Sequence, residues 1–159
     1  MALRLLEQYF ELGEQPDAAA AYVTRAEIYR DTGNIDAALD AFEGALAEQA
    51  LQPGHRTSSW LGFAMLVAEA GLTVHYSRAL EILQREVPQA AFPVERHHGH
   101  GARALILDDI GQADAAQAAA RSAIAAANES YSGFRNHPTL GLATVVDSLF
   151  DRRVADLAG

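Results

Sequence analysis

The 159-residue sequence contains no cysteine and no lysine, and it has only 5 prolines. Without cysteine, disulfides and zinc sites built from thiolates are excluded. The sequence has no run of 18 apolar residues that would span a bilayer, and its charged N-terminal segment lacks the apolar stretch of a secretory signal. Runs of β-branched and aromatic residues, which favour strands, are also missing. These absences predict a cytoplasmic, helical protein.

Acidic residues outnumber basic residues by 21 to 12, which gives a formal net charge of -9. Nucleic acids and anionic membrane surfaces carry charge of the same sign and would be repelled at long range. We therefore expect neither among the partners of this protein. Every basic residue other than histidine is arginine, and alanine is abundant. This bias indicates a bacterial origin with a GC-rich genome.

The sequence nearly repeats itself, because residues 31–48 and 109–126 are identical at eight of eighteen positions. A weaker copy lies between them around Gly71. The three glycines Gly33, Gly71 and Gly111 are 38 and 40 residues apart, and each separates two apolar segments. A glycine at such a point permits the positive φ that ends one helix and lets the next fold back. The pattern predicts three helical hairpins.

Further turn signals, rich in glycine and proline, divide the sequence into eight predicted helices. Their expected ranges are 1–13, 17–31, 34–50, 57–70, 73–87, 94–109, 112–129 and 138–155. Asp36 and Asp114 fall in the first turns of two of these helices, where the helix dipole favours an anion. The predicted fold class is all-α.

The hairpins resemble the tetratricopeptide repeat (TPR), a helix-turn-helix unit with small residues at helix crossings and large residues at a few other positions. The first hairpin, counted from Ala19, places these residues on the family's small and aromatic positions: Ala26, Tyr29, Ala38, Phe42 and Ala45. The second hairpin matches at these positions: Trp60, Ala64, Val67, Leu80 and Leu83. It departs from the family at Tyr76, where alanine is usual. The third hairpin matches with alanine in place of the usual aromatic residue: Ala104, Leu107, Gly111, Ala116, Ala120 and Ala123.

This resemblance implies one TPR-like domain over residues 1–159, a right-handed α-solenoid of about three stacked hairpins. Its parts would be an N-terminal helix over 1–16, repeats over 17–52, 57–90 and 94–130, and a C-terminal helix over 137–157. The periods exceed the family's period of about 34, so we expect extra residues in the helices or in the links between repeats. The end helices either cap the stack or present an apolar face to another copy, which would allow a homo-oligomer.

The resemblance also implies a concave groove that is lined by the first helices of the repeats and holds a peptide or partner segment. The register places these residues in it: Val23, Glu27, Arg30, Ser58, Leu61, Met65, Glu69, His98, Leu105 and Asp108. An apolar centre bordered by carboxylates should prefer a partner with apolar anchors and basic flanks. The alternative is that some of these residues pack between helices.

Four histidines form the only cluster with the character of metal ligands: His97, His98, His100 and His137. His98 and His137 are candidates for a shared metal if they line one edge of the groove. The alternative is a set of solvent-exposed histidines at a loop and a helix start. HExxH and CxxC motifs are absent from the sequence, and we expect no metal and no cofactor.

The sequence shows no machinery for catalysis, because it has no cysteine nucleophile and no GxSxG motif. We expect a non-catalytic protein-binding module that acts as a scaffold or adaptor. Two alternatives are a ligand- or peptide-responsive regulatory domain of a larger signalling or transcription protein, and a secretion chaperone. The TPR clamp for the C-terminal carboxylate of heat-shock chaperones is disfavoured, since that clamp uses lysines and this sequence has none.

Overall fold

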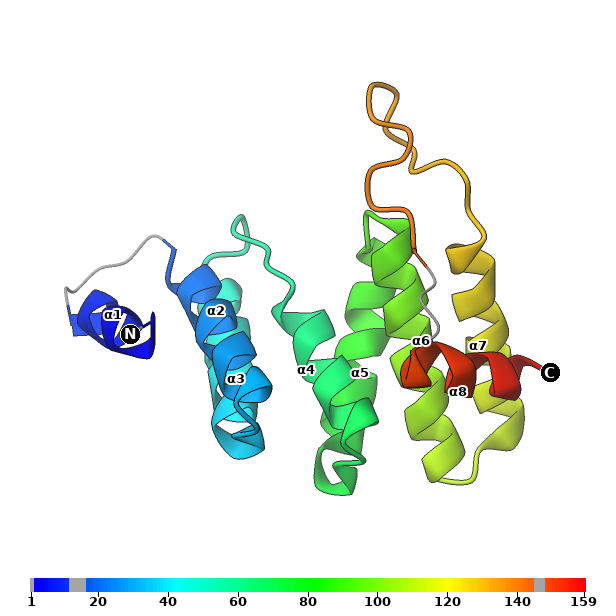
Figure 1. Cartoon of the computed structure of the whole chain (residues 1–159), viewed down its shortest axis with the longest axis horizontal. Coiled ribbons are helices and arrows are strands. Elements are labelled where there is room, and N and C mark those ends of the chain that lie inside the picture. Colours follow the sequence, from blue (N-terminus) through cyan, green and yellow to red (C-terminus); the bar gives the residue numbers. More distant parts are fainter. Residues whose placement is uncertain (1, 12–16, 145–147) are drawn as a thin grey trace. The chain divides into compact units, whose positions relative to one another are not determined.

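The computed structural model describes residues 2–11, 17–144 and 148–159, and within these ranges every regular element is a helix (Figure 1). The α-helices are α1 (Ala2–Glu11), α2 (Ala18–Asp31), α3 (Ile35–Leu51), α4 (Ser59–Glu69), α5 (Tyr76–Glu86), α6 (Pro93–Asp109), α7 (Ala113–Ala127) and α8 (Leu149–Ala158). Two short 3-10 helices, η1 (Thr73–His75) and η2 (Val87–Gln89), flank α5. The all-α fold class is confirmed. None of the helices in the described part of the chain has the length and apolar character needed to cross a bilayer.

The described chain divides into two compact units, which we call the first unit (Met1–Leu66) and the second unit (Val67–Gly159). The division falls inside α4. The first unit contains the hairpin of α2 and α3, and the second contains the hairpin of α6 and α7. The hairpin turns contain Gly33 with φ 79° and Gly111 with φ 78°, and Gly71 follows α4 with φ 64°. The predicted positive φ of all three glycines is confirmed.

Seven predicted helices agree with the structure to within three residues at each described end. The eighth prediction, a helix over 138–155, was wrong at its start. Residues 138–144 are not helical, and α8 begins only at Leu149. Its N-cap is Ser148, whose hydroxyl accepts a hydrogen bond from the Asp151 backbone N at 3.0 Å. Residues 145–147 of the expected helix lie outside the described residues.

The segment before α8 is non-helical because it is packed against the start of α6. Gly141 has φ 69°, which cannot continue a right-handed helix, and its carbonyl accepts a hydrogen bond from Val94 N at 2.9 Å. A Cβ at Gly141 would lie 2.2 Å from Phe92 Cδ1, so only glycine fits there. Phe134 stacks on the same Phe92 ring, with the two centroids 5.3 Å apart. These tertiary contacts determine the path of the segment.

Alanine and glycine allow the helices of each hairpin to approach closely. In the first unit, Ala26, Ala38 and Ala45 are completely buried, as the TPR-like pattern predicts for small positions. Phe42 lies against the backbone of α4, since a Cβ on Gly62 would come within 2.4 Å of its ring. Large aromatic side chains therefore occupy space that glycine leaves free.

The second unit packs in the same way. Every buried residue of α7 is an alanine, whereas α6 buries alanines together with larger residues such as Leu105 and Ile106. The following alanines of the two helices have no exposed surface: Ala102, Ala104, Ala116, Ala120 and Ala123. Gly101 accommodates the ring of Phe150 from α8, because a Cβ at position 101 would lie 2.5 Å from Phe150 Cζ. Tyr76 is buried, and its hydroxyl hydrogen-bonds to the Asp109 carboxylate. Burial and this carboxylate raise the pKa of Tyr76 to about 12.

The hairpin turn of the second unit tests whether the positive φ of Gly111 contributes to stability. Gly111→Ala should lower the free energy of unfolding by about 1 kcal/mol, because an alanine with positive φ is strained. A Cβ at Gly111 would meet no atom within 4 Å, so the loss would come from the backbone alone. Urea titration followed by circular dichroism measures the effect.

Gly54→Ala is the matched control, because Gly54 is equally open to a Cβ but its φ is not positive. We expect a change within about 0.5 kcal/mol for this variant. Equal losses for the two variants would contradict the assignment of strain to the turn at Gly111.

Candidate functional site

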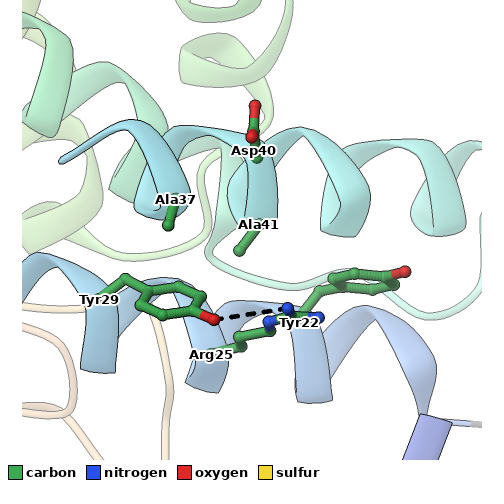
Figure 2. A pocket seen from close by; sticks show the side chains of 6 residues that line it. All are labelled: Tyr22, Arg25, Tyr29, Ala37, Asp40 and Ala41. Atoms are coloured by element: carbon green, nitrogen blue, oxygen red, sulfur yellow. Dashed lines mark hydrogen bonds between the residues drawn. The ribbon is translucent and has the colours of Figure 1, made fainter. Parts of the chain in front are cut away.

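A partly open hollow of about 180 Å³ lies between α2 and α3 in the first unit (Figure 2). We call it the α2/α3 pocket. Three side chains of α2 and three of α3 line it: Tyr22, Arg25, Tyr29, Ala37, Asp40 and Ala41. The α2 residues are spaced by three and four positions, so they share one face of that helix.

The Tyr22 wall of the pocket is held from two sides. Gly44 of α3 leaves room for the ring, because a Cβ there would lie 2.9 Å from Tyr22 Cδ1. Phe10 of α1 contacts the same ring, with the two centroids 4.5 Å apart. Contacts within the protein therefore restrain this wall, so little conformational entropy of Tyr22 would be lost when a ligand binds.

Arg25 carries the positive charge of the pocket. Its guanidinium carbon lies 5.5 Å from the centre of the Tyr29 ring and 5.8 Å from that of Phe10, in the range of cation–π contacts. Its Nη2 donates a long hydrogen bond of 3.4 Å to Tyr29 Oη. Within the described part of the chain, no carboxylate forms an ion pair with Arg25. Most of its five N–H donors are therefore left for water or a ligand.

The side of the pocket formed by α3 is mainly apolar. Figure 2 shows Ala37 and Ala41 pointing toward the tyrosine rings of α2, whereas Asp40 points away from them. Asp40 is exposed and lies at the rim. Apart from Asp40 at its rim, the pocket thus presents one cation, two tyrosine side chains and methyl groups, an arrangement suited to binding a small polar group on an apolar stem.

The residues predicted for the concave groove differ widely in exposure. In the first unit, Glu27, Arg30 and Ser58 are exposed, Leu61 and Met65 are half-buried and Val23 is buried. In the second unit, Glu69 and Asp108 are exposed, His98 is half-buried and Leu105 is only 1 % exposed. Leu105 and Val23 therefore pack inside the protein, as the alternative reading of the register allowed. The groove itself stays a prediction.

Sequence reasoning did not identify the pocket. The repeat pattern places Tyr29 on an aromatic position and gives no role to Tyr22 or Arg25. A signal was present, since two tyrosines and an arginine share one face of the helix over 17–31. The gap that Gly44 leaves for the Tyr22 ring depends on how α3 packs on α2 and is visible only in the structure.

Among the described residues, no group of three or more potential metal ligands is arranged around one point. His137 is exposed in the segment between α7 and α8, and His98 and His100 are half-buried on α6. Burial lowers the pKa of His98, and the neighbouring His97 lowers it further. His97 itself is only 2 % exposed, so the expectation of solvent-exposed histidines was wrong for this residue.

His97 connects three helices of the second unit. Its Nδ1 lies 3.0 Å from the Ala123 carbonyl oxygen of α7, and its Nε2 lies 3.0 Å from Asp151 Oδ1 of α8. The hydroxyl of Ser148 donates to the other carboxylate oxygen of Asp151 at 2.7 Å. This is not a catalytic triad, because the serine bonds to the carboxylate and the histidine has no ring nitrogen left to act as a base. The network holds α8 against the α6/α7 hairpin.

The chain was compared with protein-family models, with curated proteins and with solved structures, and none of them matched. Function is therefore inferred from the chemistry of the chain itself. We compare two groups of polar side chains, the His97–Asp151 network and the α2/α3 pocket, which differ in their access to solvent. The His97–Asp151 network is buried, whereas the α2/α3 pocket is open to an incoming group.

The Asp151 carboxylate predicts how stability depends on pH. Burial alone would raise the pKa of Asp151, but the hydrogen bonds from Ser148 and His97 outweigh burial and lower it. A lowered folded-state pKa contributes stability above the unfolded pKa of about 4, and this contribution is lost as pH falls through the folded-state value. The stability difference between wild type and Asp151→Asn should thus be largest near pH 6 and shrink toward pH 3.

Asp156→Asn, at an exposed position on the same helix, serves as the control and should show a much smaller difference over that pH range. Urea titrations at pH 3, 4, 5 and 6 give the free energies of unfolding. A difference for Asp151→Asn that stays constant with pH would contradict the role of its ionised form.

Proposed function

We propose that this protein is a non-catalytic interaction module of the tetratricopeptide-repeat type, in which helical hairpins stack in a right-handed solenoid and bind a segment of another protein. Three observations support this proposal. Residues 31–48 and 109–126 repeat, the hairpins turn at glycines with positive φ, and alanines fill the helix contacts at the positions expected for the family. Repeats of this kind provide extended binding surfaces.

The α2/α3 pocket is the main observation that supports a binding role. Its volume of about 180 Å³ is well below the several hundred Å³ that are typical of cofactor and drug-sized ligands. A space of this size suits a single side chain. A protein segment that inserts one anchor side chain into a pocket and lies across neighbouring helices is a common mode of recognition.

The predicted groove supplies the remaining contacts in this proposal. Leu61 and Met65 are half-buried on α4, so each keeps apolar surface that a partner can cover. In the first unit, the exposed carboxylate of Glu27 suits a basic flank on the bound segment. A cytoplasmic bacterial scaffold or adaptor is the role that we assign. No described residue specifically favours the regulatory domain or the secretion chaperone.

Peptide selection tests the proposed function. A random peptide library displayed on phage and panned against the full chain should enrich a defined set of binders. The double variant Leu61→Asp with Met65→Asp should bind these peptides at least about 10-fold more weakly, because charges replace the apolar surface. Isothermal titration calorimetry measures the affinities, and circular dichroism checks that helicity is retained.

Val74→Asp is the matched control, because Val74 is 86 % exposed and an aspartate there removes no packing. Peptide affinity should remain within about two-fold of the wild type for this variant. The absence of any enriched peptide would overturn the binding function. Enrichment that is unaffected by the double variant would remove only the groove assignment.

A further inference from the structure

We propose that the α2/α3 pocket recognises a carboxylate side chain, Asp or Glu, in the bound segment. This inference rests on the proposed function and specifies the chemistry of its anchor. The α2 residues of the pocket lie on the side of that helix adjacent to the predicted groove residues Val23, Glu27 and Arg30, so one bound segment can contact both sets. Charge, hydrogen-bond donors and space in the pocket all favour a carboxylate.

The charge in the pocket favours an anion. Arg25 has no ion-pair partner among the described residues, and Asp40, the acidic residue of the lining, points away from the tyrosines (Figure 2). A cationic side chain entering the pocket would meet the guanidinium at close range. An anion would instead gain an ion pair with an arginine that is already partly shielded from water by aromatic rings.

Two hydrogen-bond donors stand side by side for the two oxygens of a carboxylate. Tyr29 Oη accepts its hydrogen bond from Arg25 Nη2, so the phenol hydrogen is not used in that contact. No hydrogen bond donated by this hydroxyl is found within the described residues. Because Arg25 Nη2 and Tyr29 Oη are 3.4 Å apart, one guanidinium N–H and the phenol O–H can point at the same carboxylate.

The size and the apolar wall of the pocket fit the methylene groups of an acidic side chain. The methyl groups of Ala37 and Ala41 form an apolar wall that the methylene groups of Glu or Asp can contact. Arg25 is restrained by its contacts with Phe10 and Tyr29, so it loses little freedom when it binds an anion. An acidic residue beside apolar neighbours is therefore the partner chemistry that the pocket favours.

The test uses the full chain and the displayed random peptide library. Peptides selected on the wild type should share Asp or Glu at one position. For the best binder, synthesised as a free peptide, replacing that residue by Asn or Gln should weaken binding about 10-fold. On Arg25→Gln protein the same replacement should change affinity less than two-fold. Tyr29→Phe should weaken binding of the acidic peptide about three- to five-fold.

Arg103→Gln is the control, because Arg103 is an exposed arginine on α6 that belongs neither to the pocket nor to the predicted groove. The acidic peptide should keep its preference on this variant. Charge reversal gives a second readout, since panning on Arg25→Glu should enrich Lys or Arg at the anchor position. Circular dichroism shows whether each variant keeps its helicity.

The outcomes separate the two proposals. If no peptide is enriched on the wild type, both the binding function and this inference fail. If peptides are enriched without an acidic position, or the Arg25→Gln variant retains the full preference for the carboxylate, only the inference fails. A phosphoserine at the anchor position that binds 10-fold more tightly than Glu would also overturn it, in favour of phosphate recognition.

Discussion

Close approach of helices, made possible by alanine and glycine at the points of contact, is the constraint on which the rest of this structure depends. Within each hairpin, alanines with no exposed surface lie among the larger buried residues. Where glycine replaces alanine, the ring of a neighbouring aromatic residue fills the space, as Phe42 does at Gly62 and Phe150 does at Gly101. Dense packing of this kind leaves few voids, so a hollow that persists requires a specific cause.

The α2/α3 pocket follows from the same constraint. The Tyr22 ring lies on α3 because Gly44 has no side chain, and Phe10 fixes it from the other side. With that wall in place, the small side chains of Ala37 and Ala41 leave a space between the helices that Arg25 and Tyr29 border but do not fill. Differences in side-chain size between residues of two helices are thus enough to form this pocket, and it needs no long loop.

Polar groups in the two units have different roles because their access to water differs. In the second unit, His97 and Asp151 are buried, and their oxygens and nitrogens are used in bonds between helices. Such a network stabilises one arrangement of α6, α7 and α8, because any other arrangement would leave a buried polar group unpaired. In the first unit, Arg25 lies at an open site and retains donors for a partner.

Local patterns in the sequence determined the helices and their turns. The helical ranges and the positive φ of Gly33, Gly71 and Gly111 were predictable, because helix propensity and glycine conformation depend on near neighbours in the chain. Tertiary structure decided the rest. The late start of α8, the burial of His97 and Leu105, and the pocket beside Tyr22 all depend on contacts between residues distant in sequence. Such contacts arise from packing, which periodicity along one helix does not encode.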